Sequence, residues 1–257
     1  EYVEHLNREA PTSGRVSLDA DTSMSPGSLP AAYLAAGGVL AGVDAIMAGQ
    51  VQHVFCAVRP PGHHCERETA MGFCFFNNIS IAAHYALEHH KLERVAIIDF
   101  DVHHGNGTED ICAGDDRILM CSIFQHPFYP YSGTDKPAAN MVNVPLPGGS
   151  GSEELQQAVL ESWIPRLEEF KPQMIFISAG FDAHREDDMG GLGLVEADYA
   201  WLAVVGAIVA VGLNPTRKYT HSPLEIPPCT PPLRLVLVRT RALSPSPSTT
   251  NSSLWDS

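Results

Sequence analysis

Short apolar runs alternate with longer amphipathic segments over the first four fifths of the chain. Each apolar run is flanked by polar residues, glycine or proline, which is typical of short buried strands. Apolar residues recur at the helical interval in the longer segments, as at Leu155, Val159, Trp163 and Leu167. The pattern predicts strands at residues 54–58, 95–100, 118–123 and 174–178, and helices at 30–48, 77–90, 153–170 and 195–211.

This alternation of strands and helices indicates the fold class. Parallel strands need long crossover connections, and helices supply them while covering the sheet. The sequence therefore predicts an α/β fold, a three-layer sandwich in which helices cover both faces of a mostly parallel central sheet. We find no internal repeat.

The composition changes near residue 212. Eight of the 20 prolines and a net positive charge lie in residues 213–257, whereas the preceding residues are strongly acidic. Proline interrupts both helical and strand hydrogen bonding. We therefore expect one domain over residues 1–212 and a mostly disordered, Pro/Ser-rich tail over residues 213–257.

Charge and cysteine content exclude several classes of protein. The net charge of −14 disfavours direct nucleic-acid binding through a basic surface. The six cysteines show no Cys-x-x-Cys spacing, so we expect reduced thiols rather than a disulfide framework. The sequence shows neither an 18-residue apolar run nor a signal segment, so we expect no membrane association and an intracellular location.

Polar clusters follow the predicted strands, where ligands bind in open α/β sheets. Asp101 and His103 stand two residues apart after one strand, so their side chains leave the backbone on the same side. Asp182 follows another strand and can supply a third ligand. Two carboxylates and an imidazole leave coordination positions open for water and substrate, which is typical of a catalytic zinc site, although Fe²⁺ also fits.

Two adjacent histidines, His63 and His64, follow a stiff Pro-Pro-Gly turn. One of them could take a proton from a water molecule at the metal. Asp99 and Asn106 flank the metal motif and could orient the two rings, the acid making His63 more basic than the amide makes His64. Each cluster alone has a non-catalytic interpretation, such as a surface His-His pair or an Asx turn. Their joint occurrence at strand ends favours a catalytic site.

At these motifs the sequence resembles the zinc-dependent histone deacetylase family, and specifically its class II branch with the bacterial deacetylase-like and acetylpolyamine amidohydrolase relatives. The similarity covers residues 17–202 and includes Arg-Pro-Pro-Gly-His-His, Gly-Phe-Cys-Phe-Phe-Asn-Asn and Asp-Phe-Asp-Val-His-His-Gly-Asn-Gly. Asn106 is the residue that indicates class II. The resemblance implies the arginase/deacetylase-like version of the α/β sandwich.

The resemblance also implies the roles of individual residues. It implies one Zn²⁺ held by Asp101, His103 and Asp182, and a tandem histidine pair in which His64 is the general base. It makes Asp99 the partner that orients His63, and it implies substrate contacts and a structural K⁺ site. The substrate-binding residues implied are Asp21, Gly72, Phe73 and Tyr129, and the potassium residues implied are Asp99, Asp101, His103, Ser122 and Ile123.

The implied activity is zinc-dependent hydrolysis of N-acetyl-lysine in proteins, with an acetylated histone tail or a tubulin-like protein as partner. One alternative substrate is an acetylpolyamine, although Met189 stands where those relatives place an acidic residue. A second alternative is a catalytically inactive form that binds an acyl-lysine or a partner protein. Arginase-type chemistry is disfavoured because Gly105, Asn106 and Gly107 stand where further carboxylates are needed.

Two departures from the family pattern stand out. The family's oxyanion donor, a tyrosine in a Gly-Gly-Tyr motif, has no counterpart after Leu202, and Tyr219 has the wrong context. We therefore expect a domain shortened at both ends, with its C-terminal strands missing and weak activity. Neither a nuclear-type basic cluster nor a transit peptide is visible, so cytoplasm, nucleus and an organelle stay open, as does the oligomeric state.

Overall fold

The computed structural model describes residues 1–210 and 234–239. It contains a six-stranded sheet in the order β3-β8-β7-β4-β5-β6, and all five strand pairings in that sheet are parallel. The strands are β3 (His53–Cys56), β4 (Val95–Asp99), β5 (Ile118–Gln125), β6 (Met141–Leu146), β7 (Met174–Ala179) and β8 (Leu235–Arg239). A separate antiparallel pair is formed by β1 (Val16–Ser17) and β2 (Ser23–Met24).

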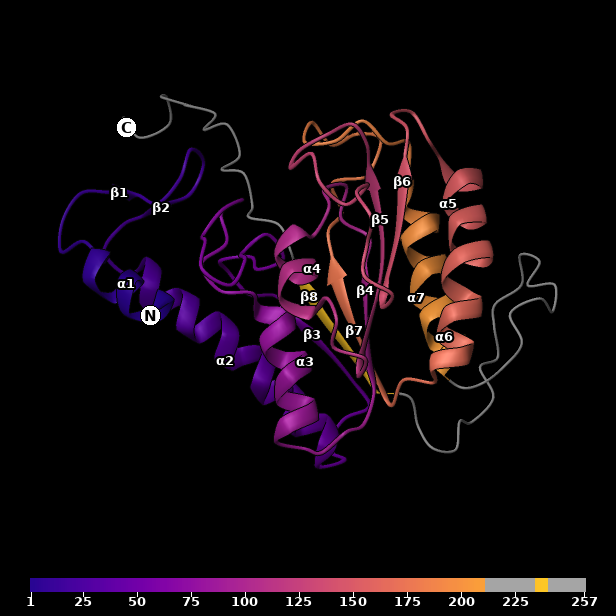
Figure 1. Ribbon diagram of the computed structural model, residues 1–257, viewed down its shortest axis with the longest axis horizontal. Coiled ribbons are helices and arrows are strands. Elements are labelled where there is room, and N and C mark those ends of the chain that lie inside the picture. Colours follow the sequence, from indigo (N-terminus) through magenta and orange to yellow (C-terminus); the bar gives the residue numbers. More distant parts are fainter. Residues whose placement is uncertain (211–233, 240–257) are drawn as a thin grey trace, which may run out of the picture.

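Helices cover both faces of this sheet (Figure 1). One layer contains α2 (Ser28–Met47), α3 (Asn78–Glu88) and α4 (Asn106–Cys112). The other contains α5 (Ser152–Ala158), α6 (Ile164–Phe170) and α7 (Glu196–Ala210), with a π-helical turn, η1 (Val159–Trp163), between α5 and α6. The N-terminal α1 (Tyr2–Glu9) lies beside the start of α2 (Figure 1). The predicted three-layer α/β sandwich with a parallel sheet is confirmed.

The strands divide the core into two halves because successive side chains point to opposite faces. In β4, Ala96 and Ile98 belong to the cluster that includes α5 and α6, whereas Val95 and Ile97 belong to the cluster that includes α2 and α3. Every residue of β4 is therefore buried. This burial on both faces explains why the strand reads as an unbroken apolar run.

The four predicted strands and four predicted helices are all present, with boundaries shifted by a few residues. The N-terminal helix α1, the short α4 and the strands β6 and β8 were not predicted. β6 lies at one edge of the sheet and contains Asn143 and Pro145, and only its first and last residues are buried. Proline is tolerated at sheet edges, so this strand lacks the apolar signal of the central ones.

Strand β8 lies within residues 213–257, the segment that we expected to be mostly disordered. Leu235–Arg239 pairs with β3 on one side and β7 on the other, and Val236 and Val238 are buried. A run of alternating leucine and valine fits a strand well enough to outweigh its proline-rich surroundings. The expected loss of C-terminal strands therefore does not extend to β8, which follows Leu202 in the sequence. Residues 211–233 and 240–257, including Tyr219, lie outside the described residues.

Helix α2 is long and apolar enough to cross a membrane by length and composition alone. Its residues Val39, Val43 and Ile46 are buried in the same cluster as residues of α3, β4 and β7. A helix with such a buried stripe serves as a core helix of an α/β domain.

The described cysteines are free thiols, as expected. All five are buried, and Cys229 lies outside the described residues. Burial raises the pKa of the thiols of Cys65 and Cys112 to about 11, so both are protonated at neutral pH. The thiols therefore act as small core residues.

Candidate active site

The carboxyl ends of two neighbouring strands bring the three predicted metal ligands together. Asp101 and His103 follow β4, and Asp182 follows β7, which pairs with β4 in parallel register. All three residues are buried, and one ligand atom from each lies within 4.8 Å of the others. The structure therefore forms a cluster of two carboxylates and one imidazole from segments about 80 residues apart.

The spacing of the ligand atoms suits a small divalent cation. His103 Nδ1 lies 3.0 Å from Asp101 Oδ1 and 3.3 Å from Asp182 Oδ2. Ligand bonds of about 2.0–2.1 Å in a tetrahedral site place neighbouring ligand atoms roughly 3.3 Å apart. The cluster thus fits a metal ion with only small side-chain shifts, and its N/O donors suit Zn²⁺ or Fe²⁺.

The electrostatics of the cluster also favour a cation. Burial opposes ionisation of Asp101, but the charges of the nearby histidines lower its pKa. Burial and the neighbouring Asp101 charge raise the pKa of Asp182. Burial likewise disfavours a charged His103, yet its hydrogen bonds to both carboxylates raise its pKa to about 10. Two buried carboxylates thus share one proton on His103, which is the position that a metal would take.

Gly180 leaves the space that this cluster needs. A Cβ at this position would overlap the carboxylate of Asp101. The backbone N–H of Val102 donates to Asp182 Oδ1 at 3.1 Å, which orients the carboxylate from the second strand. The glycine after β7 is therefore required by close approach of the two loops.

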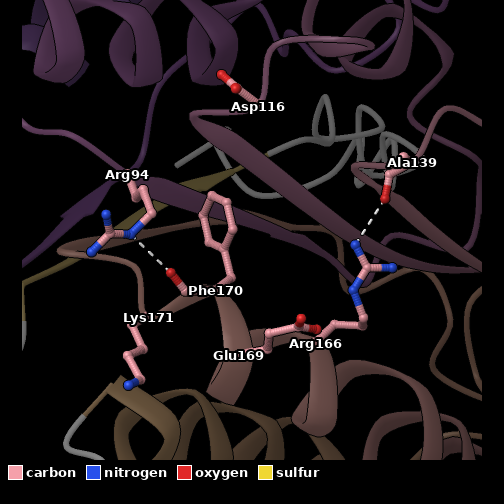
Figure 2. A pocket seen from close by; sticks show the side chains of 7 residues that line it. All are labelled: Arg94, Asp116, Ala139, Arg166, Glu169, Phe170 and Lys171. Atoms are coloured by element: carbon pink, nitrogen blue, oxygen red, sulfur yellow. Dashed lines mark hydrogen bonds between the residues drawn. The ribbon is translucent and has the colours of Figure 1, made fainter.

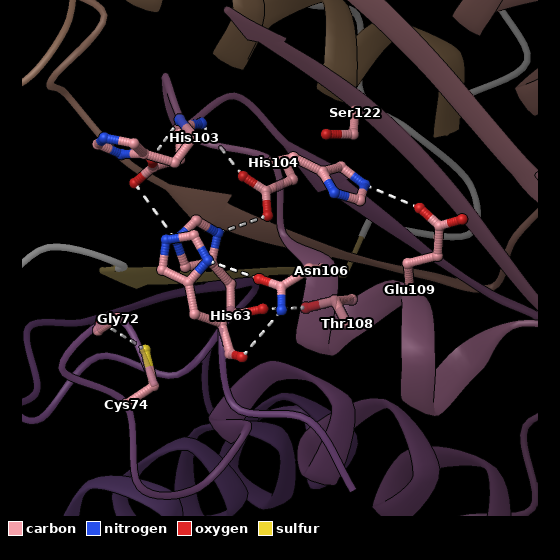
Figure 3. A network of polar contacts seen from close by, with 12 residues as sticks. His63, Gly72, Cys74, His103, His104, Asn106, Thr108, Glu109 and Ser122 are labelled. Carbon is pink, nitrogen blue, oxygen red and sulfur yellow. Dashed lines mark hydrogen bonds and ion pairs between the residues drawn. The ribbon is translucent and has the colours of Figure 1, made fainter. Parts of the chain in front are cut away.

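The two predicted catalytic histidines lie beside the cluster, and Figure 3 shows one of them, His63, with the ligand His103. Their ring centroids are 4.0 Å apart, and His63 Nε2 is 3.8 Å from Asp101 Oδ2. His63 Nδ1 lies 3.0 Å from Asp99 Oδ2, and His64 Nδ1 lies 2.8 Å from Asn106 Oδ1. The structure therefore pairs each histidine with the partner that the sequence suggested for it.

The different partners make the two histidines unequal. Burial disfavours the charged form of His63, but the carboxylates of Asp101 and Asp99 outweigh burial and raise its pKa. Burial and the charge of His63 hold the pKa of His64 well below its usual value. The surroundings therefore favour the protonated form of His63 and the neutral form of His64, which is the form that accepts a proton.

The predicted substrate-binding residues surround His64. The Tyr129 ring meets the His64 ring edge-on at 5.3 Å, while Phe73 is 45% exposed. Gly72 has a positive φ of 57°, and a Cβ there would overlap the ring of His64. Asp21 accepts a hydrogen bond from the backbone N–H of Gly72 at 3.0 Å. In this structure Asp21 thus holds the turn that carries Phe73.

The residues of the implied potassium site include two of the metal ligands, Asp101 and His103, and three buried residues of β4 and β5. Ser122 is the register partner of Asp99, and the Ser122 hydroxyl donates to the carbonyl of Ile123 at 3.4 Å. Asp99 also accepts a hydrogen bond from the backbone N–H of Asp101 at 3.1 Å. The five residues are buried together, and K⁺ binding itself stays a prediction.

The sequence analysis did not predict a second network of polar contacts, which lies around His104 next to the site (Figure 3). His104 Nε2 lies 2.8 Å from Glu109 Oε2, and Nδ1 lies 2.8 Å from the hydroxyl of Ser132. Glu109 also accepts a hydrogen bond from Asn143 at 2.8 Å. The adjacent His103-His104 pair was the available signal, since only the first of these rings belongs to the predicted metal site.

A separate hollow of about 800 Å³ lies at the opposite edge of the sheet (Figure 2). Its lining includes Arg94, Asp116 and Lys171, which precede β4, β5 and β7. Parallel strands place their amino ends at one edge and their carboxyl ends at the other. The histidines and carboxylates of the candidate site therefore do not face this hollow.

Three comparisons with known proteins find relatives that are named deacetylases or closely related enzymes, or that contain a related domain. The family model of the histone deacetylase domain matches residues 1–211. A histone deacetylase-like amidohydrolase from Pseudomonas aeruginosa is 42% identical over 200 residues, covering 75% of this chain and 52% of that protein. A probable deacetylase from Archaeoglobus fulgidus is 40% identical over 206 residues, covering 78% and 56% respectively. The crystal structure of the HDA15 HD domain aligns with a TM-score of 0.78 at 30% identity, covering 93% of this chain and 66% of that chain.

Fold, site and relatives together place the chain in the arginase/deacetylase superfamily. Within it, the chain belongs to the histone deacetylase family. The chain spans about half to two thirds of the length of these relatives. The resemblance inferred from the sequence motifs is confirmed, whereas placement in the class II branch stays a prediction based on Asn106.

Proposed function

We propose that this chain binds one Zn²⁺ through Asp101, His103 and Asp182 and hydrolyses the acetamide of N-acetyl-lysine in proteins. The observation that carries the proposal is the convergence of these three ligands with His63 and His64 at one edge of the sheet. Three N/O protein ligands leave coordination open for water and substrate. Family membership supports the hydrolase chemistry.

The chain's own residues account for the proton transfers. When bound, the metal polarises a carbonyl oxygen and lowers the pKa of a water molecule. Neutral His64 accepts the proton of the attacking water, and Asn106 fixes the ring for this task. Asp99 favours the charged form of His63, which would place positive charge next to the oxygen that becomes negative. The proton taken by His64 then passes to the leaving lysine amine.

Aromatic and acidic side chains support an acyl-lysine in a protein as the substrate. Phe73 and Tyr129 would flank the neutral aliphatic stem and exclude bulky side chains. The acidic chain favours a cationic segment around the acetylated lysine, as in a histone tail. Met189 is exposed and apolar in the loop after Asp182, which favours a protein over a polyamine. We propose that this activity takes place inside the cell, in the cytoplasm, the nucleus or both, with an organelle as the alternative.

Two further features belong to the proposal. A structural K⁺ would be held near Asp99, Asp101 and Ser122, largely through backbone carbonyl oxygens. Turnover would be slow because the sequence has no Gly-Gly-Tyr motif to supply an oxyanion donor. Loss of one such donor typically lowers kcat by a factor of about 10²–10³.

Zinc content and deacetylation of an acetyl-lysine peptide test the proposal on the wild-type chain and on Asp182→Ala. Asp182→Ala should lose the active-site zinc and all measurable turnover, because two ligands remain of three. Asp188→Ala is the matched control, since Asp188 is an exposed acid of the same loop. Equal zinc and turnover in wild type and Asp182→Ala would overturn the ligand assignment.

Substrate class is tested in the same assay by comparing the peptide with acetylspermidine. Faster turnover of the peptide supports the proposal, and faster turnover of acetylspermidine replaces it with a polyamine deacetylase. Zinc bound without turnover of either substrate would leave an acyl-lysine-binding or partner-binding protein.

A further inference from the structure

Three metal-ligating side chains also meet on the surface, where helices α2 and α3 end. Asp44 lies in the last turn of α2, and His89 and His90 directly follow α3. One ligand atom from each lies within 4.8 Å of the others. This cluster is separate from the active site, because the opposite end of α3 is the one that contacts the loop of His63 and His64.

The cluster is partly assembled by hydrogen bonding and stacking. His90 Nε2 lies 2.7 Å from Asp44 Oδ1, and the Tyr85 hydroxyl donates to the same oxygen at 2.9 Å. The ring of Tyr85 stacks on that of His89 with centroids 4.7 Å apart and planes 7° apart. Tyr85 therefore orients both a carboxylate and an imidazole, as outer-sphere partners of metal ligands do.

The backbone electrostatics at this point favour a cation. The negative ends of the α2 and α3 dipoles both lie near the cluster, and neither helix has a basic residue in its last turn. The guanidinium of nearby Arg117 forms ion pairs with Glu88 and Asp115, so two carboxylates balance its positive charge.

We propose that Asp44, His89 and His90 bind a divalent transition-metal ion of the Zn²⁺ type at this second, surface site. Two imidazoles and one carboxylate are a ligand set that such ions prefer, and solvent fills the remaining positions. The ligand atoms must come to roughly 3.3 Å from one another. Asp44 is about half exposed and His89 is exposed, so their side chains can move into place. A bound ion would join the ends of two helices that pack on each other.

Zinc stoichiometry of the untagged, chelator-stripped chain tests this proposal by equilibrium dialysis. The His89→Ala/His90→Ala variant should bind one Zn²⁺ fewer than wild type, whereas His5→Ala/His53→Ala, which removes two exposed histidines elsewhere, should match wild type. Asp182→Ala reports the active-site ion separately, so it should retain the surface ion. Equal stoichiometry and affinity in wild type and His89→Ala/His90→Ala would overturn the surface site, whatever becomes of the active-site ion.

Thermal unfolding provides a second readout. Zn²⁺ added to the Asp182→Ala chain should raise Tm, because the ion binds the folded arrangement of the two helix ends. Adding His89→Ala and His90→Ala to that chain should abolish the increase. Tyr85→Phe should weaken zinc binding about tenfold, since the ligands lose their orienting hydroxyl. An unchanged Tm increase in the chain lacking both histidines would contradict the proposal.

Discussion

The hydrogen-bond partner of each catalytic histidine decides how the pKa values of the two rings differ. His63 faces a carboxylate of Asp99 and His64 faces the amide of Asn106, although the two rings are adjacent in sequence and equally buried. A carboxylate stabilises the imidazolium, whereas an amide oxygen does so only weakly. The order of the two pKa values could be predicted from sequence because both partners belong to the Asp99–Gly107 segment. Their distances to the rings could not.

The pH dependence of kcat/KM should follow this order. His64 must be neutral to accept a proton, and its pKa lies below the usual 6.5, so the acid limb should fall below pH 6.5. Asn106→Asp places a carboxylate beside His64, favours its charged form and should move the acid limb to higher pH. The measurement is the pH profile of peptide deacetylation with each chain.

Asn7→Asp is the control for this variant, because Asn7 is exposed on α1 and far along the chain from the site. Its acid limb should coincide with that of wild type. An acid limb that stays in place in Asn106→Asp would show that His64 is not the group whose protonation stops the reaction.

At the scale of elements, the residue that caps helix α3 also links this helix to the active-site loop. Asn77 Oδ1 accepts a hydrogen bond from the backbone N–H of Ser80 at 3.1 Å, which caps the helix. Its amide donates to the carbonyl of Cys65 and to the hydroxyl of Thr108. The Asn-Asn pair predicts a helix start. Only the structure shows that the same side chain joins α3 to the histidine loop and to α4.

Asn77→Ala should lower the free energy of unfolding by roughly 1–3 kcal/mol, because a cap and two buried hydrogen-bond acceptors lose their partner. Urea denaturation followed by circular dichroism gives this value. Asn7→Ala, at an exposed position, should stay within about 0.5 kcal/mol of wild type. A loss as small as that in Asn77→Ala would mean that the cap does not stabilise this helix.

At the scale of the whole molecule, strand order creates the site. β4 and β7 are neighbours although β5 and β6 come between them in the sequence, and this brings Asp182 to Asp101 and His103. β8 continues the sheet between β7 and β3, the strand that leads to the histidine pair. The positions of the site residues thus depend on a sheet that is completed by β8, a strand from beyond residue 233.

Val236→Asp tests that dependence. Val236 is fully buried in β8, so an unpaired carboxylate there should destabilise the domain by several kcal/mol and lower Tm strongly. Val51→Asp makes the same change at a valine that is 43% exposed, and its Tm should stay near that of wild type. Calorimetry of the three chains is the measurement. Equal Tm values for Val236→Asp and wild type would show that β8 does not belong to the folded sheet.

The sequence by itself determined the α/β class, the central strands and the chemical identity of the site. Buried parallel strands read as continuous apolar runs, and the ligating residues lie within a few positions of their ends. Tertiary structure alone decided the strand order, the position of β6 and β8, and the role of Asp21 in holding the Gly72 turn. The physical reason is that these features depend on contacts between distant segments, whereas local side-chain periodicity records only which faces are buried.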